Sequence, residues 1–149
     1  MLRPFQAEDL IEYLDMSRTF YASEATDHQV PEEHFHRTFQ ETVSGSALAR
    51  GWLITDDDGR ALGYLLASLT WSNEFGGRVA WLEELFLKPE TRGRGLGRKV
   101  LEEVLRQLKS RDQVLGFRLE VTPANESVTV LYAKLGFTKV PYQEWWMAV

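Results

Sequence analysis

A glycine- and arginine-rich run, Arg92 to Arg98, carries the residues of this sequence that are best suited to bind an anion. It reads Arg-Gly-Arg-Gly-Leu-Gly-Arg and lies between a strand-like segment and an amphipathic one. Glycines let the backbone approach a ligand closely, and the free N–H groups of a first helical turn face an anion. Arginine adds charge-assisted hydrogen bonds, so this pattern predicts a pyrophosphate site. The predicted site comprises Arg92, Gly93, Arg94, Gly95, Leu96, Gly97 and Arg98.

Two familiar phosphate-binding motifs do not fit this run. A Walker loop requires Gly-Lys-Ser/Thr, but here Gly97 is followed by Arg98 and Lys99. The dinucleotide fingerprint requires a third glycine where Arg98 stands. These mismatches argue against a nucleotide-binding protein of either kind. Alternatively, the run binds no ligand and is only a solvated basic turn at the start of a helix.

Two adjacent carboxylates, Glu83 and Glu84, precede the glycine-rich run within the strand-like segment 79–87. Carboxylates are candidates for removing a proton from a reacting group. Successive residues of a strand point to opposite faces, so at most one of the two should face a substrate unless a bulge intervenes. Either could also be an exposed strand residue with no catalytic role.

The elements that must position these residues follow from hydrophobic periodicity and turn signals. Four helices are expected. The first starts at Asp9, the second runs from Pro31 to just before Gly45, and the third covers 96–108. The fourth runs through Leu135, with Asn125 as its N-cap. Strands are expected at 52–55, 62–69, 79–87 and 116–121, with a short opening strand and one or two closing strands in 137–149. This order predicts an α/β (α+β) fold. Its mixed, mostly antiparallel central sheet would have six to seven strands, with about four helices on its faces.

Length and composition are those of one soluble domain. The chain has 149 residues, 44% hydrophobic and 26% charged, and residues 1–149 are expected to form a single domain. There are no cysteines, no signal-like N-terminus and no apolar run long enough to cross a membrane, which favours the cytoplasm. The net charge of -5 argues against nucleic-acid binding and weakly favours cationic partners.

Two blocks of the sequence resemble the GNAT superfamily of acyl-CoA N-acyltransferases. Arg92, Gly95 and Gly97 match its Arg/Gln-x-x-Gly-x-Gly/Ala pattern, and Asn125 to Phe137 resembles its Asn…Tyr…Gly-Phe segment. The blocks occur in the family's order and spacing. Val128 departs from the pattern, since a small residue is common there.

The resemblance implies an acetyl-CoA-dependent N-acetyltransferase that acts by direct attack in a ternary complex. The glycine-rich run would bind the cofactor pyrophosphate. The backbone of Leu85, Phe86 and Leu87 would pair with the pantetheine arm, Asn125 would contact that arm, and Tyr132 would lie near the sulfur.

A neutral amine is the nucleophile that such a reaction needs. With an ordinary pKa of about 10.4, an alkyl amine loses roughly 4–5 kcal/mol of reactivity by being protonated at neutral pH. Glu83 and Glu84 are the candidate bases, and resemblance to the polyamine and diamine branch favours Glu83. A backbone N–H would stabilise the oxyanion, and Tyr132 would protonate the leaving thiolate or donate a hydrogen bond to it.

The acceptor is expected to be a small cationic amine. The residues proposed to form an acidic aromatic pocket for it are Trp71, Glu74, Phe75, Trp81 and Glu83. A peptide or protein amine is the rival acceptor, and a non-catalytic acyl-CoA-binding module is the alternative of a different class.

The remaining aromatic and histidine residues carry no predicted chemistry. His34 and His36 are two apart on a helix and face different directions, so no metal site is assigned. Trp145 and Trp146 are adjacent, so in a strand one would face inwards and one outwards. The outward one could cover the acceptor or form a homodimer contact, although a plain position in the core is the favoured interpretation.

Overall fold

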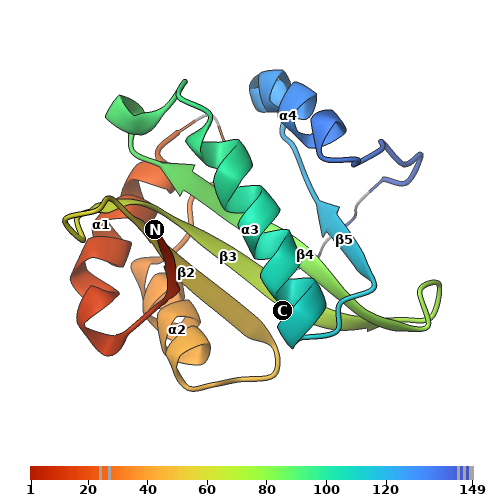
Figure 1. The fold of residues 1–149 in the computed structure, drawn as a ribbon, viewed down its shortest axis with the longest axis horizontal. Helices are drawn as coiled ribbons and strands as arrows, with labels where there is room; N and C mark the ends of the chain where they lie inside the picture. Colours follow the sequence, from red (N-terminus) through yellow and green to blue (C-terminus); the bar gives the residue numbers. More distant parts are fainter. Residues whose placement is uncertain (24, 27, 144, 146, 148–149) are drawn as a thin grey trace.

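Five strands form one mixed sheet in the computed structural model, which describes residues 1–23, 25–26, 28–143, 145 and 147. They are β1 (Leu2–Pro4), β2 (Ala49–Thr55), β3 (Ala61–Ser72), β4 (Gly77–Leu87) and β5 (Gly116–Leu119). The pairs β1–β2, β2–β3 and β3–β4 are antiparallel, and β5 lies parallel to β4. Figure 1 shows β5 at one edge of the sheet, connected to β4 through the long helix that crosses in front.

Helices cover both faces of this sheet (Figure 1). Helices α1 (Leu10–Tyr21) and α2 (Glu32–Val43) pack on one face, and α3 (Leu96–Arg111) packs on the other. The last helix, α4 (Thr129–Lys134), follows a 3-10 segment, Pro123–Val128. Shorter 3-10 turns, Ala7–Asp9 and Pro89–Thr91, precede α1 and follow β4. None of the helices in the described ranges has the length and apolarity required to cross a membrane.

Side-chain alternation along the strands divides the core into two layers. On the α3 face, Leu65 and Ala67 of β3 pack with Val104 and other apolar residues of the helix. On the α1/α2 face, Tyr64 and Leu66 of β3 pack with aromatic residues of both helices. This is the arrangement that period-2 strands and period-3.6 helices impose when each must bury one apolar side.

The structure confirms the mixed, mostly antiparallel sheet and corrects three details. Five strands are present among the described residues, rather than the predicted six to seven. Residues 137–143, where the closing strands were expected, form no strand. Asn125 was wrongly assigned as a helix N-cap, because it lies inside the 3-10 segment and α4 begins only at Thr129. Val128, a β-branched residue with poor helix propensity, ends the 3-10 segment and is the N-cap of α4, so the regular helix starts only after it.

The predicted pair of C-terminal tryptophans is only partly described. Trp145 is 87% exposed, whereas Trp146 lies outside the described residues. Neither residue supports or contradicts the expected dimer contact.

The regular pairing of β4 breaks at Glu83. Leu66 of β3 pairs with Glu84, but the next residue, Ala67, pairs with Leu82, so Glu83 is an extra residue in β4. Such an insertion is a β-bulge, which redirects side chains locally. The parallel pairing of β4 with β5 also ends at Leu82, opposite Leu119. Among the described strands, β4 therefore has no β5 partner beyond this point.

An ion pair fixes the start of α1 to the edge strand β1. The guanidinium of Arg3 donates to both carboxylate oxygens of Asp9, each at 2.7 Å, and the backbone N–H of Gln6 donates to Asp9 at 2.8 Å. Burial alone raises the pKa of Asp9, but the hydrogen bonds from Arg3 and Gln6 hold that pKa below its ordinary value. The ionised carboxylate therefore stabilises the folded state.

We predict that Asp9→Asn lowers the free energy of unfolding at neutral pH by about 1 kcal/mol. A carboxyl with a lowered folded-state pKa contributes stability above its unfolded pKa, and loses it as pH falls through the folded pKa. The difference between wild type and variant should therefore shrink below about pH 4 in urea titrations. Asp58→Asn, at a side chain 74% exposed, is the matched control and should change stability by less than about 0.5 kcal/mol. An Asp9→Asn difference that is independent of pH would contradict this assignment.

Candidate active site

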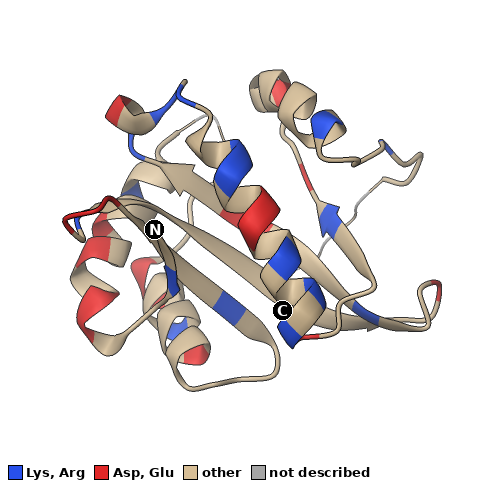
Figure 2. Cartoon of the chain, viewed as in Figure 1, with Lys and Arg blue, Asp and Glu red and all other residues tan. Residues whose placement is uncertain are grey.

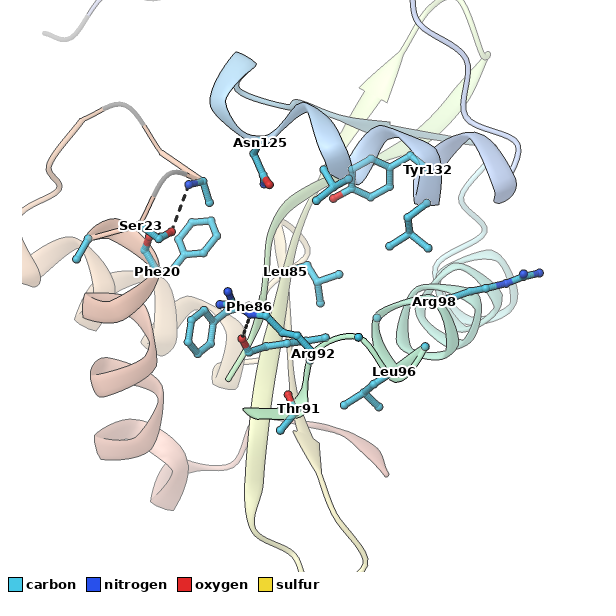
Figure 3. Close-up of a pocket in the computed structure, with 18 residues that line it drawn as sticks. Phe20, Ser23, Leu85, Phe86, Thr91, Arg92, Leu96, Arg98, Asn125 and Tyr132 are labelled. Carbon is cyan, nitrogen blue, oxygen red and sulfur yellow. Dashed lines mark hydrogen bonds between the residues drawn. The ribbon is translucent and has the colours of Figure 1, made fainter. Parts of the chain in front are cut away.

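A cavity of about 750 Å³ opens between the end of α1, the end of β4, the glycine-rich loop and α4. Figure 3 shows these four elements around the same space. Its lining includes all the predicted cofactor-binding residues except Arg94. The lining residues in the predicted set are Leu85, Phe86, Leu87, Arg92, Gly93, Gly95, Leu96, Gly97, Arg98, Asn125 and Tyr132.

The glycine-rich loop adopts a backbone that favours glycine at two positions. Gly93 and Gly95 have φ angles of 75° and 74°, in the left-handed region, and Gly95 is the N-cap of α3. Apart from the adjoining residues of the chain, a Cβ atom at either glycine would meet no described atom within 4 Å. The space beside the loop is therefore open to a ligand. The first N–H groups of α3 have no partner within the helix and carry its positive dipole end.

The three arginines of the loop have different surroundings. Arg92 donates from Nε to the Leu87 carbonyl at 2.8 Å, and its guanidinium lies 5.8 Å from the centroid of the Phe86 ring. Arg98 points away from the cavity in Figure 3 and pairs with Glu102 at 2.8 Å. Arg92 is thus held at the cavity wall, while the charge of Arg98 is directed elsewhere.

Arg94 lines a second, smaller hollow of about 420 Å³ on the other side of the loop. Lys99 and Asp56 line the same hollow. Figure 2 shows basic residues along this loop and on α3, and acidic residues on α1. The loop end of the molecule therefore attracts anions more strongly than the net charge of -5 suggests.

The strand edge beside the cavity is available for backbone hydrogen bonds. Leu85, Phe86 and Leu87 follow the last β4–β5 pair, at Leu82, and all three line the cavity. An extended ligand arm can therefore occupy the place that a further stretch of parallel strand would take. This edge and the glycine-rich loop are contiguous along the cavity wall.

The bulge places both candidate carboxylates on the same face of the sheet. Glu84 contacts Tyr64 and Tyr21 on the α1/α2 face. Glu83 accepts a hydrogen bond from Ser68, which alternates with Leu66 and so lies on that face too. The expected opposition of the two side chains is therefore absent, because the bulge interrupts the strand alternation.

The two carboxylates differ in burial. Glu83 is exposed, whereas Glu84 is half-buried and accepts hydrogen bonds from Tyr64 at 2.5 Å and Tyr21 at 2.8 Å. Burial raises the pKa of Glu84, and the negative charge of Glu83 adds to the rise, although the two phenols oppose it. Glu84 precedes Leu85, and Tyr21 lies between Phe20 and Ala22, so the carboxylate is close to residues of the cavity wall.

Tyr132 and Asn125 face one another across the upper part of the cavity. Figure 3 shows the phenol oxygen and the amide directed into the same space above Leu85. The ring of Tyr132 packs edge-on against Phe137, with centroids 6.0 Å apart. Burial raises the pKa of Tyr132, so its hydroxyl is protonated at neutral pH.

The predicted acidic aromatic cluster is occupied by a cation of the chain itself. Arg118 pairs with Glu74 at 2.8 Å, and its guanidinium lies 5.9 Å and 5.6 Å from the ring centroids of Phe75 and Trp81. Trp71 is 72% exposed. None of the five residues predicted for the acceptor lines the cavity. The structure thus separates this cluster from the cavity. Of the five predicted residues, only Glu83 adjoins Glu84.

Sequence reasoning missed the contribution of α1 and the loop that follows it. Phe20, Ala22, Ser23 and Ala25 line the cavity, and Tyr21 and Tyr64 hold Glu84. No local pattern marks these residues, because they reach the site from more than 50 positions before the glycine-rich loop or from within an ordinary strand. Thr91, Val128 and Leu131 complete the lining.

Comparison with known proteins identifies similar sequences and structures among acetyltransferases. The acetyltransferase (GNAT) family matches residues 10–137. A thialysine N-epsilon-acetyltransferase of Mus musculus is 29% identical over 114 residues, covering 76% of this chain and 62% of that protein. The chain spans between 43% and 62% of the length of the curated relatives it matches.

Two solved structures share the fold at low identity. An integron cassette protein from the mobile metagenome of Cole Harbour Salt Marsh has a TM-score of 0.82 and 24% identity, covering 99% of this chain and 90% of that one. An acetyltransferase from Clostridium acetobutylicum, solved with acetyl-CoA, has a TM-score of 0.77 and 15% identity, covering 100% and 95% of the two chains. Together with the family match across most of the sequence, the fold and the glycine-rich loop show that the chain belongs to the GNAT family of acetyltransferases, whose members use acetyl-CoA as co-substrate.

Proposed function

We propose that this protein is an N-acetyltransferase that transfers the acetyl group of acetyl-CoA to a small cationic primary amine. The observation that carries this proposal is the continuous cavity wall formed by the glycine-rich loop and the free edge of β4. Glu84 does not line the cavity itself, but it directly precedes the lining residue Leu85 in β4. The loop would bind the pyrophosphate, and the edge at Leu85–Leu87 would bind the pantetheine arm. A protein of the same fold from Clostridium acetobutylicum has been solved with acetyl-CoA, which supports acetyl-CoA as the ligand of this fold.

Glu84 is the better candidate for the base, although resemblance alone favoured Glu83. A base works best when its pKa lies close to the working pH, and burial moves the pKa of Glu84 in that direction. Two phenols fix both of its oxygens, whereas Glu83 is exposed and, among the described residues, accepts a hydrogen bond from Ser68 alone. The proton would pass from the ammonium to the Glu84 carboxylate directly or through water, and the neutral nitrogen would then attack the thioester carbonyl.

Tyr132 is better placed as a hydrogen-bond donor to sulfur than as a full acid. Proton transfer from a phenol near pKa 10 to a thiolate near 8.5 is uphill by roughly 2 kcal/mol. Burial raises the pKa of Tyr132, which makes this transfer more unfavourable. Its hydrogen bond would stabilise the departing thiolate without complete proton transfer.

The adjacent carboxylates favour a cationic acceptor. Glu83 and Glu84 share one face of β4, and no described Lys or Arg forms an ion pair with either of them. The mouse relative is named for acetylating the ε-amine of thialysine, which is also a small amine. A small amine with a second positive charge would therefore gain an ion pair with Glu83 while Glu84 takes its proton.

Gly95→Asp should weaken acetyl-CoA binding at least about tenfold, because a carboxylate would enter the anion site at the N-terminus of α3. Calorimetric titration with acetyl-CoA measures this effect. Gly59→Asp is the matched control, since Gly59 also has a positive φ, 83°, and open space around it, but lies in the β2–β3 turn. Equal affinities for the two folded variants would remove the basis for the cofactor site.

Removing the hydroxyl in Tyr132→Phe should lower kcat about tenfold, the loss expected for a hydrogen bond to sulfur. An obligatory acid would instead cost about 10²–10⁴-fold. Steady-state rates of thiol release, measured across pH, distinguish these roles, because an acid also produces a falling limb at high pH. Tyr142→Phe, at a side chain 75% exposed, is the control. Wild-type rates for Tyr132→Phe would reduce Tyr132 to a packing residue.

Dicationic amines should be better acceptors than neutral amines or peptides, with kcat/KM falling as salt is raised. Salt weakens the attraction between exposed charges, over a Debye length of about 8–10 Å at ordinary ionic strength, and the Glu83 side chain is exposed to solvent. Glu83→Gln should lower kcat/KM for a dicationic amine by about two- to fivefold. A thiol-release panel of diamines, amino acids, aminoglycosides and peptides tests this. A peptide as best acceptor, with no salt effect, would contradict the assigned substrate class.

A further inference from the structure

Glu84 is held by tyrosines from two different elements. Tyr64 of β3 donates to Oε2 at 2.5 Å, and Tyr21 at the end of α1 donates to Oε1 at 2.8 Å. Each carboxylate oxygen therefore has its own phenol donor, and together the two bonds fix the plane of the carboxylate. Tyr64 is fully buried in the sheet and also accepts a bond from Ser17 at 3.3 Å. Tyr21 is the donor that comes from outside the sheet.

The ring of Tyr21 is confined on three sides. It stacks on Phe35 of α2 with centroids 5.2 Å apart and packs edge-on against Phe20 at the same distance. His28, in the connection to α2, lies edge-on at 6.3 Å. Such packing restricts the rotation of the side chain, so the hydroxyl is aimed at Glu84 before any substrate arrives.

The position of Tyr21 in the chain connects the carboxylate to the cavity. Tyr21 is the last residue of α1, its neighbours Phe20 and Ala22 line the cavity, and Ser23 and Ala25 continue that wall. A shift of this end of α1 would therefore move the phenol and the wall together. The Glu84 orientation and the cavity shape are coupled through one residue.

We propose that Tyr21 is a positioning residue for acetyl transfer: its phenol keeps the Glu84 carboxylate ionised and correctly oriented to accept the proton of the amine. This role rests on the function proposed above, with Glu84 as the base. The charged and titratable groups that face Glu84 are Tyr13 and Tyr21 of α1, Tyr64 of β3 and Glu83 of β4.

Removing the Tyr21 hydroxyl should shift the pKa of Glu84, and the direction of that shift depends on whether the phenol stabilises the ionised or the protonated carboxyl. Burial and the charge of Glu84 raise the pKa of Tyr21, so its phenol stays protonated and donates at neutral pH. A donor to the ionised carboxylate lowers the pKa of Glu84, against the rise that burial causes. Without the hydroxyl, the pKa of Glu84 should rise further, and a reaction that needs the ionised form should require higher pH.

The test compares Tyr21→Phe with Tyr13→Phe, a matched change on the same helix. Tyr13 belongs to the same buried cluster and its phenol feels the charge of Glu84, but among the described residues the hydrogen bonds to that carboxylate come from Tyr21 and Tyr64, and the Tyr13 phenol interacts with Ser17. Carbon-13 NMR titration of labelled glutamate, with Glu84 assigned by its loss in Glu84→Gln, gives the pKa without requiring activity. We expect the pKa of Glu84 to rise by about one unit in Tyr21→Phe and to stay unchanged in Tyr13→Phe. The acid limb of kcat/KM should move by the same amount.

Two results would overturn the role of Tyr21. One is an unchanged pKa of Glu84 in folded Tyr21→Phe. The other is a raised pKa with no movement of the acid limb. Glu84→Gln distinguishes a wrong role for Tyr21 from a wrong choice of base. If Glu84→Gln transfers acetyl at the wild-type rate, Glu84 is not the base, and the proposed role of Tyr21 fails together with it. Loss of transfer in Glu84→Gln, with cofactor affinity retained, would leave the base in place and the Tyr21 readouts decisive.

Discussion

The β-bulge at Glu83 is the constraint on which the rest of the site depends. One extra residue opposite Leu66 and Ala67 turns Glu83 and Glu84 to the same face of the sheet. Beyond it, Leu85 and Leu87 return to the α3 face, while the parallel partner β5 has already ended its pairing at Leu82. One local irregularity thus places a carboxylate pair and a free strand edge next to each other, as a site for proton removal and acyl binding requires.

The site combines opposite polarities at its two ends. The glycine-rich loop presents the positive end of α3 and the guanidinium of Arg92, which suit phosphates. The bulge presents Glu83 and Glu84, which suit an ammonium group. Burying an isolated carboxylate is costly, and the phenols of Tyr21 and Tyr64 offset that cost for Glu84. A reaction between an anionic cofactor and a cationic amine fits this separation of charge.

The expected acceptor pocket shows where pattern reasoning fails. Trp81 and Glu74 were grouped because they are close in sequence to Glu83, and aromatic and acidic residues together suit a cation. In the structure, the parallel pairing of β4 with β5 sets Arg118 opposite Trp81, and this arginine takes the cation position. The partner lies 44 residues from Glu74 along the chain, so no local pattern could reveal it.

The sequence by itself determined the order of the helices and of the strands predicted between 52 and 121, the glycine-rich loop and the family, but not where α4 begins. These depend on hydrophobic period, turn residues and the spacing of glycines, all of which are local properties. Only the tertiary structure decided that the carboxylates share a face, that Glu84 is the less exposed one, and that Tyr21 and Tyr64 hold it. The physical reason is that strand pairing, and not local propensity, sets the position of a bulge, and a shift of one residue reverses which face each side chain occupies.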